Sequence, residues 1–326
     1  MGLQSSSTDG MAILEVEGYT ANSLIKAETR VLAKPQFMVR FWGVRGSIPT
    51  PGPDTVKYGG NTTCLEVRCD DQIIIIDTGT GARLLGKQLL SEAYGNLELS
   101  LFYSHLHLDH IQGFPFFAPI YEPTTTVNIY SGPPAESTTR GVLTTQMADP
   151  SFPVPLAHLR STLNFKNIQR GDTVRLGRVE IQTCELNHPG HAMGIRINHR
   201  GKSFVQCSDV EHRSPEPDQE VIDLCKDADF VSYDATYVDG PEYQAHKGWG
   251  HSTWQHGVKV ADASNVGTFI AFHHDPGHND AFMDRMADAL MARRPGSLVA
   301  KEGMTIDLLS GEVSQKDLYR IGNVTN

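Results

Sequence analysis

Four residues of metal-ligand type stand within six positions, directly after a short hydrophobic segment. The segment, residues 97–103, is rich in β-forming residues and predicts a strand, and it runs into the sequence Ser-His-Leu-His-Leu-Asp-His. On an extended chain alternate residues of this run share one face, and a turn into a helix brings the last two back toward the same point. Imidazole nitrogens and carboxylate oxygens suit zinc, manganese or iron. The predicted ligands at this strand end are His105, His107, Asp109 and His110.

The composition indicates a globular protein with one substantial core. The chain has 326 residues, of which 39% are hydrophobic and 20% are charged. Its net charge of −10 disfavours a long nucleic-acid track, so a phosphate-bearing substrate needs a local site. The longest aliphatic run, residues 73–76, is far too short to span a membrane, and the five cysteines form no Cys-x-x-Cys pair. We therefore expect a soluble, cytoplasmic protein without a membrane partner.

The pattern along the chain favours a polar N-terminal extension, residues 1–36, followed by a single domain, residues 37–326. Short β-rich segments bounded by Gly, Pro, Asn or Asp alternate with helical spacings. Both halves of the domain begin with strands and continue with helices, which predicts an α/β (α+β layered) domain with two similar layers. The expected strands are 38–42, 64–68, 73–76, 97–103, 173–176, 179–186, 194–197, 203–207, 230–233 and 268–272, and the expected helices include 82–90, 218–228, 253–263 and 280–293.

The His-x-His-x-Asp-His sequence, preceded by the turn Asp77-Thr78-Gly79, resembles the metallo-β-lactamase superfamily across residues 38 to about 310. That resemblance implies a four-layer αββα metallo-β-lactamase sandwich, with a metal site at the strand ends between two β-layers. It also implies three later ligands, a histidine, an aspartate and a histidine. This chain offers His188, Asp209 and His273 in that order, each just past an expected strand.

By the same resemblance the chain holds two divalent metal ions, with zinc as the first expectation and manganese or iron as alternatives. One ion takes His105, His107 and His188, the other takes Asp109, His110 and His273, and Asp209 bridges them. A water or hydroxide between two cations is a nucleophile at neutral pH. His274 stays open as an alternative to His273 or as a supporting or substrate-contacting residue, and Asp77 is expected to support the ligand histidines.

Three further segments resemble the ribonuclease Z and phosphodiesterase branch: Phe-Trp-Gly-Val-Arg-Gly-Ser-Ile-Pro-Thr-Pro at 41–51, Tyr-Asp-Ala-Thr-Tyr at 233–237, and Gly-His-Ser-Thr at 250–253. The resemblance makes His251 the general acid for the leaving oxygen and Asp234 the carboxylate that orients it. The chain departs from the family at Tyr233, where a histidine is usual, and at Asp234, which is one methylene shorter than the usual glutamate. The residues assigned to catalysis are Asp109, His251 and Asp234.

From this resemblance and from the length of the chain between the motifs, we expect a small or short substrate, a cyclic nucleotide or a short RNA. Ribonuclease Z carries a long tRNA-gripping arm, whereas only 20 residues separate His188 from Asp209 here. Phe116 and Phe152 are candidates for an apolar wall and flap over the metals, suited to a flat group. Homodimerisation is implied by the resemblance alone.

Three other functions use the same scaffold. A lactonase or carboxylic-ester hydrolase needs the same metal ligands but has less need of an acid histidine, so the motifs at Asp234 and His251 favour the phosphodiesterase. Di-iron oxygen reduction usually places a glutamate where His107 stands. A non-catalytic metal-binding sensor typically lacks ligands, and here every ligand position is filled.

Overall fold

Two β-sheets form the centre of the region that the computed structural model describes, residues 35–93, 95–132 and 138–318. The chain divides into two units, Met1–Lys34 and Pro35–Asn326, and the description below concerns the second. The expected N-terminal extension, residues 1–36, falls outside the described residues except for its last two positions.

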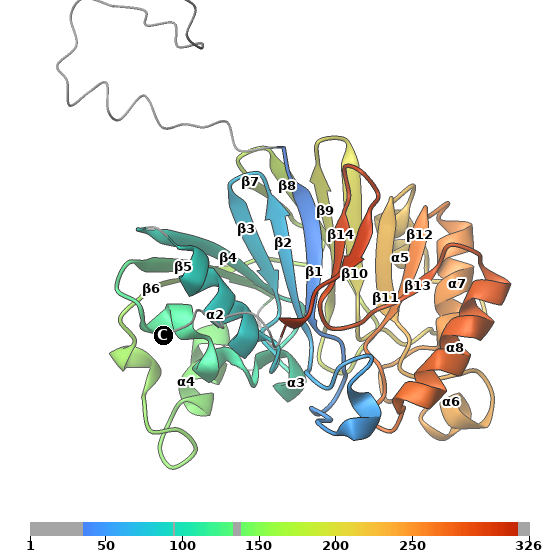
Figure 1. The fold of residues 1–326 in the computed structure, drawn as a ribbon, viewed down its shortest axis with the longest axis horizontal. Helices are drawn as coiled ribbons and strands as arrows, with labels where there is room; N and C mark the ends of the chain where they lie inside the picture. Colours follow the sequence, from blue (N-terminus) through green and yellow to red (C-terminus); the bar gives the residue numbers. More distant parts are fainter. Residues whose placement is uncertain (1–34, 94, 133–137, 319–326) are drawn as a thin grey trace, which may run out of the picture. The chain divides into compact units, whose positions relative to one another are not determined.

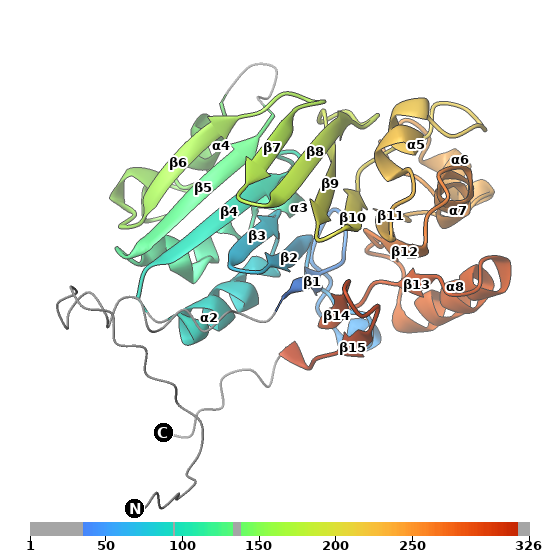
Figure 2. The same cartoon turned by 90° about the horizontal axis from the view of Figure 1, so that it is seen from above.

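The first sheet has eight strands in the order β15-β14-β1-β2-β3-β4-β5-β6 (Figure 1 and Figure 2). Strands β3 to β6 pair in parallel, and the other neighbours pair antiparallel. The strands are β1 (Phe37–Gly43), β2 (Cys64–Cys69), β3 (Gln72–Ile76), β4 (Leu97–Tyr103), β5 (Thr125–Ser131), β6 (Thr162–Asn167), β14 (Met304–Asp307) and β15 (Val313–Gln315).

The second sheet has seven strands in the order β13-β12-β11-β10-β9-β8-β7. Strands β10 to β13 pair in parallel, so their carboxyl ends lie at the same edge of the sheet. The remaining neighbours pair antiparallel. The strands are β7 (Thr173–Leu176), β8 (Val179–Glu185), β9 (Met193–His199), β10 (Lys202–Cys207), β11 (Phe230–Asp234), β12 (Thr268–Phe272) and β13 (Leu298–Val299).

Helices cover the outer face of each sheet, which completes four layers. Helices α2 (Ala82–Glu92) and α4 (Thr139–Gln146) pack on the first sheet, and α5 (Gln219–Cys225), α7 (Trp254–Ala263) and α8 (Asp280–Arg293) pack on the second (Figure 2). Short helices α3 (Leu108–Ile111) and α6 (Pro241–Ala245) lie in connections, as do the 3-10 turns Pro53–Thr55, Phe114–Phe116, Ala118–Tyr121 and Leu156–His158. No helix in the described ranges is long and apolar enough to cross a membrane.

Side chains alternate between the two faces of each strand, so apolar residues of one strand enter different layers of the core. In β3, Ile74 and Ile76 belong to the core between the sheets, whereas Ile75 packs with the helices on the outer face. From the second sheet Ile195 and Phe204 enter the same inter-sheet core. Each such fully buried side chain stabilises the fold by roughly 1.5–3 kcal/mol. The rigid double sheet that results fixes the strand ends at which the candidate site lies.

The fold class predicted from the sequence is confirmed, and each expected strand coincides with an observed one to within two residues at either end. Two details were wrong. Helix α5 ends at Cys225 rather than at residue 228, because Lys226, with a ψ of 125°, has left the helical conformation. The helical spacing of residues 280–293 predicts that Phe282, Met286, Leu290 and Met291 share the buried face of α8, whereas Met291 is 48% exposed and Met283 is buried with Met286 and Leu290.

Candidate metal centre

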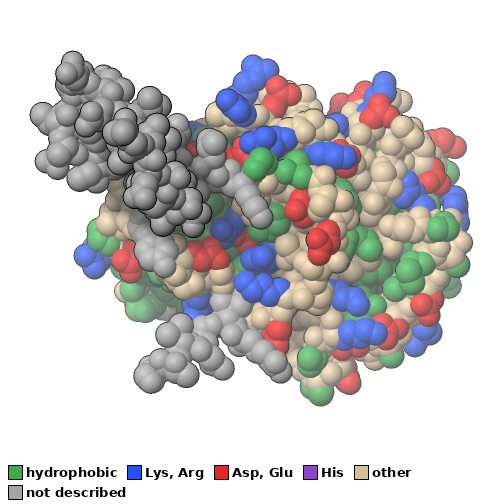
Figure 3. All heavy atoms as spheres, turned by 45° about the horizontal axis from the view of Figure 1, so that its top comes forward, with side chains coloured by type: hydrophobic (Ala, Val, Ile, Leu, Met, Phe, Trp, Pro, Cys, Tyr) green, Lys and Arg blue, Asp and Glu red, His purple; other side chains and the backbone are tan. Residues whose placement is uncertain are grey.

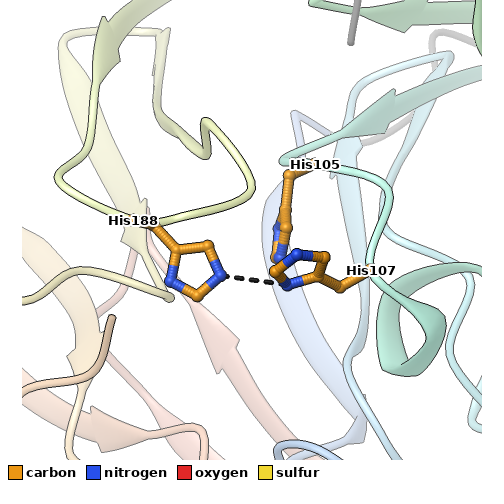
Figure 4. A group of neighbouring side chains, drawn as sticks. All are labelled: His105, His107 and His188. Carbon is orange, nitrogen blue, oxygen red and sulfur yellow. Dashed lines mark hydrogen bonds between the residues drawn. The ribbon is translucent and has the colours of Figure 1, made fainter. Parts of the chain in front are cut away.

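Three histidines meet where β4 and β8 end. His105 and His107 follow β4, and His188 lies in the turn after β8. Nε2 of His188 stands 3.0 Å from Nδ1 of His107, and the three rings each offer a nitrogen within 4.8 Å of the others (Figure 4). Burial lowers the pKa of all three imidazoles. They are therefore neutral near pH 7, the form in which a histidine can bind a metal.

A second group of four side chains lies beside the first. It contains Asp109 and His110 from α3, Asp209 after β10, and His273 after β12. Oδ2 of Asp109 is 3.4 Å from Nε2 of both His110 and His273. All four side chains are buried, and their candidate ligand atoms lie within 4.8 Å of one another. The two groups together contain all seven metal ligands expected from the sequence.

Asp209 faces both groups with different oxygens. Its Oδ1 is 3.8 Å from Nε2 of His105 and from Nε2 of His188, whereas its Oδ2 is 3.1 Å from Nε2 of His110 and 3.3 Å from Nε2 of His273. Burial alone would raise the pKa of Asp209, but the surrounding imidazoles hold it well below the ordinary value. An ionised carboxylate with one oxygen toward each group has the geometry of a bridge.

Unsatisfied atoms show that these residues fit divalent cations. Nε2 of His105, His110 and His273 and Oδ2 of Asp209 are buried and accept or donate no hydrogen bond within the described part of the chain. Each such buried polar atom costs about 1–3 kcal/mol unless it finds a partner. All four point into one cluster, so cations bound there would satisfy them together. Mixed imidazole and carboxylate donors suit zinc, manganese or iron.

The protonation of His110 also indicates that the cluster suits a divalent cation. Burial would lower the pKa of His110, but the carboxylates of Asp209, Asp109 and Asp77 together hold it well above the ordinary value. The imidazolium proton thus balances negative charge that is buried in the cluster. A bound divalent cation would supply that positive charge instead and leave Nε2 of His110 free to coordinate.

Asp77 contacts the second group through His110 and Ser104. Its Oδ1 accepts the backbone N–H of Ser104, and its Oδ2 accepts the Ser104 hydroxyl and lies 2.9 Å from Nδ1 of His110. This contact turns Nε2 of His110 toward the cluster. Asp77, Asp209 and His273 all have left-handed backbones, with φ of 61°, 61° and 62°. Such conformations are costly for residues other than glycine and are concentrated at functional sites.

The glycine turn after β1 lies against the site. A Cβ on Gly46 would come within 2.3 Å of the His273 ring, so only glycine allows this approach. The next residue, Ser47, donates its backbone N–H to Oδ2 of Asp109 at 2.7 Å. The turn therefore fixes one carboxylate oxygen and one imidazole of the second group.

His251 and Asp234 form a close pair beside both groups. Nδ1 of His251 lies 2.9 Å from Oδ2 of Asp234, so the aspartate reaches the ring although it is shorter than the family's glutamate. Burial would lower the pKa of His251, but the Asp234 carboxylate outweighs it and raises that pKa to about 9. The His251 ring centroid is 5.1 Å from that of His273 and 5.4 Å from that of His188. An imidazolium thus stands next to the candidate ligands.

His274 points away from the cluster. Its side chain is completely buried, and its Nε2 donates to the carbonyl of Ala300 at 2.9 Å. Burial lowers the pKa of His274 to about 3. The ring lies edge-on against Tyr58. A fully buried ring held in this way offers no surface to a substrate, and of the two neighbours His273 is the one that joins the ligand group.

The aromatic side chains expected near the site have different environments. Phe116 is 59% exposed and packs edge to face on Phe152 at 5.6 Å, whereas Phe117 is buried in the core of the first half. The exposed Phe116 and the half-buried Phe152 therefore pair on the segments that follow α3 and α4.

Sequence reasoning missed a recess of about 520 Å³ that adjoins His188. Its lining includes the cationic side chains of Arg213 and Lys247, both exposed. It also includes Glu211, a buried carboxylate two residues after Asp209. No local pattern indicated this recess, because the loops that meet there are far apart in the sequence.

Known proteins with related sequences and structures were compared with this chain. The model of the "Beta-lactamase superfamily domain" matches residues 73–274. A ribonuclease Z of Haloarcula marismortui is 24% identical over 307 residues, which cover 82% of this chain and 95% of that protein. The short form of human tRNase Z has a TM-score of 0.57 at 18% identity, covering 83% of this chain and 99% of that one. Zn²⁺-bound PqqB of Methylobacterium extorquens has a TM-score of 0.62 at 12% identity, covering 83% and 100%. At these identities the two structures establish a shared fold.

Proposed function

Because the chain belongs to the metallo-β-lactamase superfamily, in its ribonuclease Z and phosphodiesterase-like branch, and is a metal-dependent hydrolase of phosphodiester bonds, we propose that its substrate is a small or short phosphodiester, a cyclic nucleotide or a short RNA. The observation that carries the proposal is the Asp234–His251 pair beside two metal-ligand groups. A phosphodiester needs a proton for its departing alkoxide, and the imidazolium of this pair would supply it.

In the proposed centre, His105, His107 and His188 would hold one ion, and Asp109, His110 and His273 would hold the other. Asp209, whose two oxygens face different groups, would contribute to both. Zinc is the proposed metal, supported by the zinc-bound protein of the same fold, with manganese or iron as alternatives. When bound, such ions lower the pKa of a coordinated water and neutralise charge on phosphoryl oxygens.

The proposed acid is His251, and Asp234 holds it ready. Since Nδ1–H of His251 donates to Asp234, the second proton of the imidazolium lies on Nε2, the nitrogen free to face a leaving oxygen. Asp234 also accepts the backbone N–H of Asp209 at 3.0 Å, so one carboxylate fixes both the acid and the loop that carries the proposed bridge. The substrate oxygen takes the Nε2 proton as its bond to phosphorus breaks.

The size of the substrate is proposed from the surroundings of the site. The residues between His188 and Asp209 form the hairpin of β9 and β10 and leave no room for a long arm. The recess beside His188 has the volume of a nucleotide-sized group, and its lining includes the positively charged side chains of Lys247 and Arg213. On the face shown in Figure 3, Lys and Arg are interspersed with Asp and Glu and do not form a continuous basic track. The net charge of −10 likewise favours a local site over a long basic track for a phosphate-bearing substrate.

The test is hydrolysis of bis(p-nitrophenyl) phosphate by protein of assayed metal content, with chelator and after zinc or manganese is restored. We expect chelator-sensitive turnover, followed by turnover of cyclic nucleotides or short RNAs in a substrate screen. A parallel assay with lactones and p-nitrophenyl acetate provides the alternative outcome. Turnover of these esters without turnover of any phosphodiester would overturn the proposal in favour of a lactonase or carboxylic-ester hydrolase.

A further inference from the structure

Glu211 is a buried carboxylate that the proposed mechanism leaves without a role. Its side chain lies at the meeting point of three loops, and the residue is only 8% exposed. One loop carries His188, one carries Asp209, and one, residues 246–253, carries His251. A buried carboxylate in this place needs hydrogen-bond donors to offset its desolvation, and the identity of those donors indicates what it does.

The donors to Glu211 come mainly from the backbone of the His251 loop. Oε1 accepts the N–H of Gly248 at 2.7 Å, and Oε2 accepts the N–H of Gly250 at 2.9 Å. The hydroxyl of Tyr243 adds a longer contact of 3.4 Å to Oε1. Charge-assisted bonds to a carboxylate are about twice as strong as neutral ones, so both loop glycines are held firmly.

The backbone of Glu211 is tied to the His188 loop at the same time. Its N–H donates to the carbonyl of Asn187 at 2.9 Å, and its carbonyl accepts Nδ2 of Asn187 at 2.9 Å. Asn187 immediately precedes His188. One residue therefore joins the chain before a candidate metal ligand to the loop before the candidate acid.

Gly250 closes the connection. Its carbonyl accepts Nδ1–H of His188 at 2.8 Å, which leaves the lone pair on Nε2 toward the ligand group. Its φ is +91°, and a Cβ at this position would come within 2.2 Å of Nδ1 of His188. Glu211 binds the N–H of the same residue, so the carboxylate anchors the glycine whose carbonyl meets the ring. The residue that follows Gly250 is His251.

We infer that Glu211 is a positioning residue that couples the metal ligand His188 to the acid His251 through Gly250. The part concerning His251 rests on the proposed function, whereas the part concerning His188 rests only on the metal ligands. One carboxylate therefore controls two properties through this connection. They are the orientation that allows His188 to bind a metal and the placement of the loop that carries His251. A carboxylate that served stability alone would leave both properties unchanged in the folded protein.

The test uses Glu211→Gln, which keeps the side-chain volume but turns an amide NH₂ toward one of the two glycine N–H groups. Glu185→Gln is the matched control, because Glu185 ends β8 in the same half of the chain but lies 43% exposed in surface ion pairs. Zinc affinity is measured by competition with a chromogenic chelator. Thermal unfolding is followed with and without zinc, and turnover is compared for an activated and a poor leaving group.

We expect Glu211→Gln to weaken binding of the zinc held by His188 by about 10- to 100-fold, while the control keeps its affinity. Turnover of the substrate with the poor leaving group should fall more than that of the activated one. Unchanged zinc affinity together with a lower melting temperature of the metal-free protein would overturn the coupling. If the Gln variant does not fold, Glu211→Asp is measured in the same way, and wild-type affinity in that variant would also contradict the inference. The two parts of the inference can also be separated. If Glu211→Gln loses zinc affinity but the wild-type protein hydrolyses no phosphodiester, the link between Glu211 and His188 is supported and the proposed function is rejected.

Discussion

The substitution Asp234→Asn should both destabilise the protein and remove its acid catalysis. The carboxylate is completely buried, and each of its oxygens accepts several donors. Burial would raise the pKa of Asp234, but His251 and His273 outweigh it, so the group is ionised at neutral pH. The donors on Oδ2 are His251 Nδ1 (2.9 Å), Asp209 N (3.0 Å) and Val210 N (3.4 Å), and those on Oδ1 are Thr236 Oγ1 (2.8 Å), Thr236 N (3.0 Å) and Ser252 N (3.3 Å).

The size of the loss follows from these contacts. An asparagine has one carbonyl oxygen, so its NH₂ group must face one of the two sets of donors. A hydroxyl or an imidazole can reverse its role, but the two backbone N–H groups in either set cannot. Two buried donors are therefore left unpaired in both orientations of the amide. At about 1–3 kcal/mol for each buried unpaired donor, the variant should lose about 2–6 kcal/mol of unfolding free energy.

Asp234→Asn should also lower turnover, and the decrease should be larger for substrates with a poor leaving group. Without the carboxylate, the pKa of His251 falls from its raised value of about 9, and the ring loses its orientation. General acid catalysis contributes about 10²- to 10⁴-fold, so turnover of a dinucleoside monophosphate, which releases an alkoxide, should fall by that factor. Turnover of bis(p-nitrophenyl) phosphate, which releases a stable phenolate, should fall much less.

Urea unfolding of the zinc-loaded proteins gives the first quantity, and steady-state kinetics with both substrates give the second. A stability loss below about 1 kcal/mol would refute the assignment of the donors, because it would show that the amide satisfies them. Equal losses of kcat/KM on both substrates would refute the role of Asp234 in holding an acid, since only one of the two leaving groups needs a proton.

Three further outcomes are expected. Asp209→Ala should lose at least one zinc per chain in a metal assay, because its two oxygens face different ligand groups; two retained equivalents would contradict the bridge. His251→Ala should keep both metals and abolish the alkaline decline in turnover of the dinucleoside monophosphate. The acid must be protonated to act, so wild-type activity is lost as pH rises through the raised pKa of His251. A decline that persists in the variant would point to another group. Lys247→Gln should raise KM about 5- to 50-fold for a dinucleotide with a terminal phosphate, which corresponds to roughly 1–2 kcal/mol of charge-assisted contact. Its KM for bis(p-nitrophenyl) phosphate should stay unchanged, with Lys87→Gln on α2 as control, and an equal change for both substrates would argue against the recess as a subsite.

The sequence predicted the features that arise from local patterns. The strand β4 and the histidines after it are contiguous, so periodicity and residue type were enough to locate them. The later candidates His188, Asp209 and His273 required the family resemblance, because nothing local distinguishes a turn histidine from a ligand. The structure brings all of them into two adjoining groups.

The parts that the sequence did not predict depend on contacts between distant segments. Glu211 binds a loop 39 residues further along the chain through backbone N–H groups, which leave no mark on composition or spacing. The choice between His273 and His274 depends on which way the chain turns after β12, where His273 is left-handed and His274 faces Ala300. On α8 Met283 is completely buried and Met291 is 48% exposed, and this difference depends on what each side chain packs against rather than on helical spacing.

Anomalous diffraction at the zinc edge from crystals of the zinc-loaded protein tests the two-ion centre most directly. We predict two peaks per chain, one bounded by His105, His107 and His188 and one bounded by Asp109, His110 and His273, with Asp209 contacting both. A single peak at saturating zinc, or a second peak without Asp209 among its ligands, would contradict a two-ion centre bridged by Asp209.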